Sequence, residues 1–207
     1  MADAKEVGRI AIRSWVTLGI GVTAAAVFSS PPLEHTLIYD RTAIAAGQFW
    51  RLWTGHLVHF NASHLFWDLA VFLPAGIWLE QIVPALTRWF YLLAPLLISL
   101  LLLALQPTLE QYAGLSGIAA GVLVLLALVN LRRDAPAPRW FWPAVLSLVA
   151  IKVVLELVAD RPLFIRLDSG VNTVPLAHVG GITCALIALP AAKAEFSRRM
   201  ADRRSDR

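Results

Sequence analysis

The sequence predicts an all-α membrane protein, a bundle of six transmembrane helices. Of its 207 residues, 58% are hydrophobic and only 15% are charged. The apolar residues come in long blocks rather than at amphipathic spacing, and each block is close to the ~20 residues with which a helix crosses a bilayer. We therefore expect a single membrane domain over residues 1–207, with short basic tails at about 1–13 and 193–207.

The six blocks account for the chain in order. No small-residue cleavage site follows the first block, at about 14–30, so we expect it to stay in the protein rather than act as a removed signal peptide. The connection from about Pro31 to Ala62 carries Trp50 and Trp53, whose indole rings favour the membrane interface, and we expect it to be partly structured. The other blocks lie at about 63–81, 87–105, 115–131, 140–159 and 175–192.

The basic residues predict the orientation of the chain. If six spans alternate, thirteen of the 18 Lys and Arg residues lie on the side of the two termini. The positive-inside rule then makes both termini cytoplasmic in the inner (plasma) membrane. The net charge of +4 follows from this distribution, so we expect the basic tail to contact anionic lipid headgroups of the bilayer, and we expect no nucleic-acid partner.

Polar residues occur at one depth in three of the predicted helices. His64 lies in the first turn of the second helix, and Asp68 follows on the same face one turn deeper. Ser116 lies in the first turn of the fourth helix, and His178 lies about one turn into the sixth. All three helices enter the membrane from the outside, so these side chains lie at a similar depth. Ionisable groups inside a bilayer cost free energy, and their clustering indicates a function.

Small residues predict that the fourth and sixth helices touch. Gly117 and Gly121 in one, and Ala177 and Gly181 in the other, are spaced to let two backbones approach closely in lipid. A serine hydroxyl is a poor nucleophile until a base takes its proton at hydrogen-bond distance, and His178 is the candidate base. The alternative is that each residue is structural: a serine bonded to the carbonyl one turn back, a histidine bonding between helices, and small residues that only pack.

Four motifs resemble those of the rhomboid intramembrane serine proteases, over nearly the whole chain. A single Gly-x-Ser-Gly is a weak signal, whereas four motifs in the family's order on the expected helices are specific. The matching residues are Trp50-Arg51 followed by His59, His64 and Asp68, then Gly76 and Glu80, then Gly114-Leu115-Ser116-Gly117, and finally Ala177-His178-Val179-Gly180-Gly181.

The resemblance implies a serine–histidine dyad that needs no third carboxylate. Ser116 would be the nucleophile and His178 the general base and then acid. The oxyanion hole would use the backbone N–H of Ser116, the side chain of His64 and, in the family, an Asn at the position of Asp68. Three residues beside these would support the site: Gly114, Gly117 and His59.

Asp68 departs from the family pattern, because an ionised carboxylate only accepts hydrogen bonds and repels an oxyanion. Asp68 could orient and charge His64 so that an imidazolium donates to the oxyanion. It could instead remain protonated, which burial favours. The third alternative is a structural role in which Asp68 ties the second helix to a neighbour.

The compact six-span form, with Asp at this position, resembles the rhombosortase subgroup of bacterial rhomboids. That resemblance implies a membrane-anchored protein substrate, cut at a C-terminal anchor that contains Gly-Gly. Two other functions remain open: a catalytically silent rhomboid-like protein that binds membrane segments, and a transporter using histidines and Asp68 as a proton relay. The absence of detectable inverted repeats counts against the transporter.

No cofactor or metal is expected. Three histidines fall within nine residues, but no Cys or carboxylate cluster completes a zinc site around His56, His59 and His64. Lys152 and Glu156 lie four apart on one helix face, so we expect them to neutralise each other, with a role in substrate gating as the alternative.

Three further polar or small residues are expected to be structural. Glu80 should bond backbone or loop groups near the inner face. Cys184 should pack as a small residue within the last helix. Asn61 or Ser63 should cap the second helix.

Overall fold

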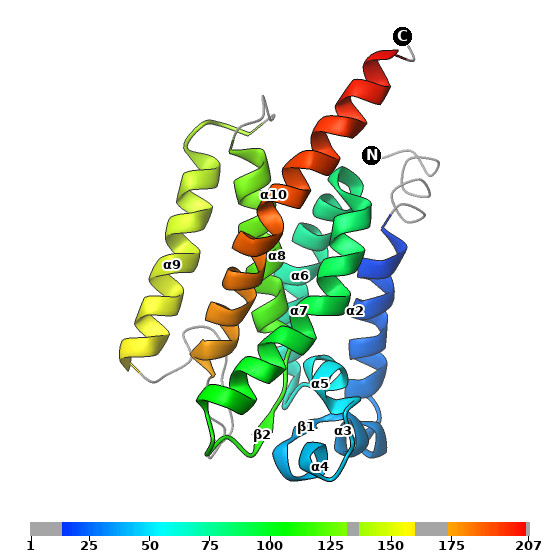
Figure 1. Ribbon diagram of the computed structural model, residues 1–207. Helices are drawn as coiled ribbons and strands as arrows, with labels where there is room; N and C mark the ends of the chain where they lie inside the picture. Colours follow the sequence, from blue (N-terminus) through cyan, green and yellow to red (C-terminus); the bar gives the residue numbers. More distant parts are fainter. Residues whose placement is uncertain (1–13, 132–136, 160–173, 206–207) are drawn as a thin grey trace.

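The computed structural model describes residues 14–131, 137–159 and 174–205, and most of these lie in long helices packed side by side (Figure 1). The long helices match the six predicted blocks in order, and all but the last end within about three residues of the expected boundaries. They are α2 (Trp15–Phe28), α6 (Ala62–Ile82), α7 (Pro84–Leu105), α8 (Ser116–Asn130), α9 (Phe141–Ala159) and α10 (Pro175–Ser205). The predicted all-α class is confirmed.

Not all of the six expected helices are long enough, within the described residues, to cross a bilayer by themselves. Within the described residues, four helices are long and apolar enough to cross a bilayer: α6, α7, α9 and α10. Helix α2 adds a fifth only when it is joined with α3 (Pro31–Leu37), from which it is bent by 113°. Helix α8 has 15 residues and is therefore roughly 22 Å long, short of the ~30 Å hydrocarbon core.

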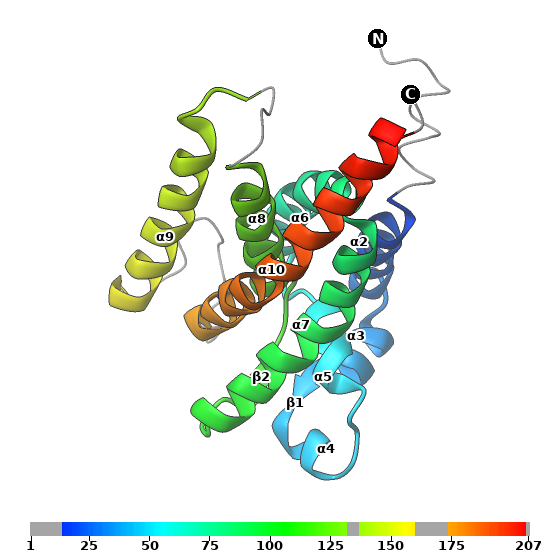
Figure 2. The same cartoon turned by 45° about the horizontal axis from the view of Figure 1, so that its top comes forward.

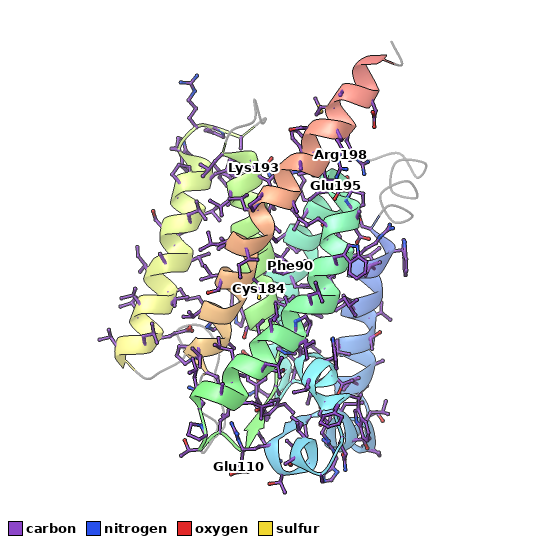
Figure 3. The ribbon with its side chains drawn as sticks, in the orientation of Figure 1. Phe90, Glu110, Cys184, Lys193, Glu195 and Arg198 are labelled. Atoms are coloured by element: carbon purple, nitrogen blue, oxygen red, sulfur yellow. The ribbon has the colours of Figure 1, made fainter. Side chains whose placement is uncertain are left out.

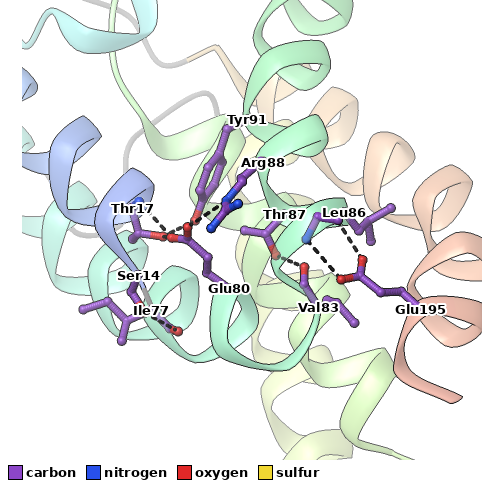
Figure 4. Close-up of polar contacts among 11 residues, drawn as sticks. Ser14, Thr17, Ile77, Glu80, Val83, Leu86, Thr87, Arg88, Tyr91 and Glu195 are labelled. Carbon is purple, nitrogen blue, oxygen red and sulfur yellow. Dashed lines mark hydrogen bonds and ion pairs between the residues drawn. The ribbon is translucent and has the colours of Figure 1, made fainter. Parts of the chain in front are cut away.

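Helix α10 runs beyond its predicted end at residue 192, because helix-forming Ala, Lys, Glu and Arg residues follow. Figure 3 shows Lys193, Glu195 and Arg198 on this extension, at the end of the bundle where α2 begins. The Glu195 carboxylate accepts hydrogen bonds from the backbone N–H groups of Ala85 (3.1 Å) and Leu86 (2.8 Å), as Figure 4 shows. The expected basic tail is thus helical as far as Ser205, and it caps the first turn of α7.

Helix α8 lies at the centre of the bundle, between α9 and α6 (Figure 2), and it packs most extensively against α10. The contact between α8 and α10 depends on glycine. A Cβ built on Gly117 would lie 2.8 Å from the carbonyl oxygen of Ala177, and one built on Gly181 would collide with the carbonyl oxygen of Gly117. The two backbones therefore touch, as the small residues predicted.

The connection between α2 and α6 is structured, as expected. It contains α3, β1 (Tyr39–Asp40), α4 (Arg41–Ala45), α5 (Arg51–Thr54) and the 3-10 helix η1 (Gly55–Leu57). Strand β1 pairs antiparallel with β2 (Gln111–Tyr112), which directly precedes α8. This pairing fixes the connection against the start of α8.

Side chains of the connection bind backbone carbonyls nearby. Arg41 donates through Nη2 to Gln106 at the end of α7 (2.7 Å), and Arg51 donates through Nη1 to Ile38 (2.7 Å). The Nε2 atom of buried His56 lies 3.1 Å from both the Pro95 carbonyl oxygen and the Ser99 hydroxyl of α7. Burial lowers the pKa of His56 to about 4, so this imidazole is neutral at physiological pH.

Glu80 has the expected structural role at the opposite end of α6. Its Oε2 atom accepts hydrogen bonds from the backbone N–H (3.0 Å) and hydroxyl (2.8 Å) of Thr17 in α2 (Figure 4). The Thr17 hydroxyl also lies 2.9 Å from the phenol oxygen of Tyr91. This network joins α2, α6 and α7.

We expect Gly181→Ala to destabilise the bundle, because the added methyl group would force α8 and α10 apart. Overpacking of this kind costs about 1–3 kcal/mol. The matched control is Gly19→Ala in α2, where no atom lies within 4 Å of the added Cβ and alanine is the better helix former. Thermal unfolding in detergent should give a lower Tm for Gly181→Ala and an unchanged or higher Tm for Gly19→Ala. Equal Tm values would contradict the close contact.

Candidate active site

Ser116 is the first residue of α8, and the glycine two residues before it fixes where the helix begins. Gly114 has a φ of 119°, a left-handed conformation that favours glycine. A Cβ at this residue would lie 2.5 Å from His64 Nε2 and 3.2 Å from Asp68 Oδ2. The backbone before Ser116 therefore lies directly against the first two turns of α6.

Two histidines share one carboxylate oxygen at this end of α6. Asn61 caps the helix, with its Oδ1 accepting a hydrogen bond from the backbone N–H of His64 (2.9 Å). Oδ2 of Asp68 lies 3.2 Å from His59 Nε2 and 3.4 Å from His64 Nε2. His59 Nδ1 also lies 3.2 Å from the carbonyl oxygen of Leu57, which links the connection to α6. The structure thus brings His59, His64 and Asp68 into one buried cluster.

The hydroxyl of Ser116 lies beside a residue that the sequence did not single out, Tyr112. The Ser116 hydroxyl lies close enough to the Tyr112 phenol to influence its pKa, and the Tyr112 hydroxyl donates to the carbonyl oxygen of Gly114 (3.1 Å). Burial raises the pKa of the Tyr112 phenol, so the phenol keeps its proton at physiological pH. An isolated aromatic residue near a helix start forms no recognisable motif, which is why sequence reasoning missed Tyr112.

His178 lies in the first turn of α10, beside the contact between the two helices. Its neighbour Ala177 packs on Gly117, the neighbour of Ser116. The expected hydrogen bond between Ser116 and His178 is not formed between these two described side chains. Within the part of the chain that the structure describes, the buried Nε2 atom of His178 has no hydrogen-bond partner.

A carboxylate from α9 also reaches His178. Nζ of Lys152 lies 2.8 and 2.9 Å from the two Glu156 oxygens, so the expected ion pair is present. The Oε2 atom of Glu156 lies in addition 3.0 Å from His178 Nδ1. The two atoms are within ion-pair distance, but the angles between them do not meet the requirement for a hydrogen bond. The sequence did not predict it, because Lys152 already completed a pair at the helical spacing of four.

The site residues lie at one end of the bundle, which we call the site end. It is the end where α6, α8 and α10 begin, where α9 ends, and where β1 and β2 lie (Figure 1). Among residues 14–131, 137–159 and 174–205, no group of three or more His, Cys, Asp or Glu side chains is placed to hold a metal ion. His56, which faces α7, is not part of the cluster of His59 and His64.

The fold and the site define a multi-pass helical membrane protein with a polar cluster at the helix starts of one end. The sequence model of the rhomboid domain matches residues 46–192, more than two thirds of the chain. The chain therefore belongs to the rhomboid family, whose members are typically intramembrane serine proteases. Comparison with curated proteins gave no match. The matched range runs from the connection before α6 into α10 and contains all the residues of the site.

Proposed function

We propose that this protein is an intramembrane serine endopeptidase with Ser116 as nucleophile and His178 as general base. One observation carries the proposal: in a rhomboid domain, the residues next to Ser116 and His178, Gly117 and Ala177, are in backbone contact. The short α8 supports it as well, because a helix of roughly 22 Å leaves its first residue below one membrane surface.

The reaction begins with a rotation about the Cα–Cβ bond of Ser116. This rotation brings the hydroxyl from beside Tyr112 to the Nε2 atom of His178, which has no hydrogen-bond partner among the described residues. His178 removes the proton as Ser116 Oγ attacks the scissile carbonyl, and the protonated imidazole then gives this proton to the leaving amine. Water hydrolyses the acyl-enzyme by the same steps in reverse.

The oxyanion formed in the attack is stabilised by the start of α8 and by α6. The backbone N–H of Ser116 is one of the donors that a helix start leaves free, and the helix dipole there has the favourable sign. His64 supplies a second donor, since its buried Nδ1 has no partner among the described residues. The contacts of Asp68 with two imidazoles favour an ionised Asp68 that orients and charges His64 over a protonated one.

The proposed substrate is a single-span membrane anchor cut near the outer face. A helical peptide does not present its carbonyl to a nucleophile, so the segment must unwind, and poor helix formers such as Gly lower that cost. The resemblance to the rhombosortase subgroup, through the Asp at position 68 and the compact form, implies C-terminal anchors containing Gly-Gly as the substrate, and the poor helix propensity of Gly supports this choice. The alternative of a catalytically silent rhomboid-like protein is not favoured, because the chain retains Ser116 and His178.

The proposed location is the inner (plasma) membrane, with both termini in the cytoplasm. Helix α2 begins and α10 ends at the end opposite the site end (Figure 1). The predominance of Lys and Arg on that side supports a cytoplasmic placement for it. The site end then faces outward, toward an exported substrate and the water that the reaction consumes.

A fluorophosphonate probe tests the proposed nucleophile on the purified full-length protein. We expect labelling of the wild type, none of Ser116→Ala, and labelling of His178→Ala that is slower by about 10²–10⁴-fold, since the base is lost. The matched control is Ser29→Ala, because the Ser29 hydroxyl bonds only within α2, to the Ala25 carbonyl. Labelling that persists in Ser116→Ala, or no labelling of the wild type beside an active rhomboid, would favour the silent alternative.

Asp68→Asn tests the role of the carboxylate shared by the two histidines. A neutral amide does not charge His64, so we expect cleavage of a single-span substrate to slow by roughly 10²-fold, the cost of weakening one oxyanion donor. The pH profile should change with it. Asp40→Asn is the control, since Asp40 caps α4 through Ala43 and Asn caps equally well. An unchanged rate and profile for Asp68→Asn would leave only the structural role of Asp68.

A further inference from the structure

Glu156 makes a contact that its ion pair with Lys152 does not require. Both residues lie on α9, one turn apart, and the Lys152 ammonium reaches both carboxylate oxygens. Lys152 remains partly exposed, at 31%, whereas the Glu156 side chain is 3% exposed. The carboxylate is therefore turned inward from its own helix, toward His178 of α10.

The contact joins the carboxylate to one of the two ring nitrogens of His178. Glu156 Oε2 lies 3.0 Å from Nδ1 of His178, while the buried Nε2 has no partner among the described residues. A small rotation of the imidazole would align Nδ1–H with the carboxylate. The ring would then be held at one nitrogen, and the other would be open to the Ser116 hydroxyl.

A neutral histidine works as a base only in the correct tautomer. A carboxylate that accepts from Nδ1–H keeps the proton on Nδ1 and the lone pair on Nε2. It also stabilises the imidazolium that forms when Nε2 takes the serine proton. Lys152 donates to both carboxylate oxygens, which limits the rotation of the Glu156 side chain.

We propose that Glu156 is a positioning residue for His178, so that Ser116, His178 and Glu156 act as a triad whose carboxylate is held by Lys152. This inference rests on the proposed function and deepens it, because a serine–histidine dyad alone needs no carboxylate. The proton on Nδ1 stays there throughout the cycle, and Glu156 stays ionised. The proton that moves passes from Ser116 Oγ to Nε2 and then to the leaving amine.

Glu156→Gln is the informative substitution because it removes the negative charge beside His178 Nδ1 with little change of shape. A neutral amide holds the proton on Nδ1 less strongly and does not stabilise the imidazolium that forms during the reaction. The tautomer with the proton on Nε2, which does not act as a base toward Ser116, therefore becomes more populated. For the full-length protein in detergent, we expect fluorophosphonate labelling to slow by roughly 10²–10⁴-fold, as when a triad carboxylate becomes an amide.

The matched controls separate positioning from stability. Glu156→Asp keeps the charge on a shorter side chain and should label at a rate between those of the wild type and Glu156→Gln. Glu195→Gln changes a carboxylate that caps α7 at the far end of the bundle, and its labelling rate should stay within about twofold of wild type. If Glu156→Gln does not fold, as judged by the loss of its thermal transition, Glu156→Asp decides the question.

A second readout does not depend on activity. Nitrogen NMR of the ¹⁵N-histidine-labelled protein, with His178 assigned by substitution, should show the Nδ1–H tautomer in the wild type and a shift toward Nε2–H in Glu156→Gln. Wild-type labelling rates and an unchanged tautomer in Glu156→Gln would overturn the inference. A wild type that the probe does not label would overturn the proposed function instead, while the tautomer measurement would still decide whether Glu156 positions His178.

Discussion

The backbone contact between α8 and α10 is the constraint on which the rest of the site depends. Gly117 and Gly181 have no side chains to separate the helices, so the backbones of α8 and α10 are in contact within the first two turns of each helix. In lipid no hydrophobic force drives helices together, and close packing of small residues is the main source of attraction. Ser116 and His178 flank this contact, so their separation is set by main-chain packing rather than by flexible side chains.

A second constraint is that the buried ionisable groups need partners, because an unpaired charge in a low-dielectric interior costs free energy. Glu80 is bonded to Thr17, and Arg41 is bonded to the carbonyls at the end of α7. Asp68 and Glu156 have histidines as partners instead. The buried carboxylates of the site end, Asp68 and Glu156, thus contact histidines, whereas buried Glu80 at the opposite end accepts hydrogen bonds from Thr17.

Depth along the helices and the contact between α8 and α10 could be predicted from the sequence, whereas the contacts of individual side chains between helices could not. Counting residues from the helix starts was enough to bring His64, Ser116 and His178 to one level, because each residue of a helix rises by a fixed amount. The spacing of Gly117 and Gly181 also predicted which helices touch. The rotation of α9 about its own axis is set by packing, so the approach of Glu156 to His178 was not visible. The position of the Ser116 hydroxyl beside Tyr112 depends on a single side-chain rotation, which no sequence pattern specifies.

The most direct test of the account is a structure of the full-length protein after reaction with a fluorophosphonate. We predict a phosphorus atom bonded to Ser116 Oγ, a Ser116 side chain that has moved away from Tyr112, and the Nε2 atom of His178 within about 3 Å of the adduct oxygens. An adduct on any other residue, or a His178 ring that remains remote from a modified Ser116, would contradict it.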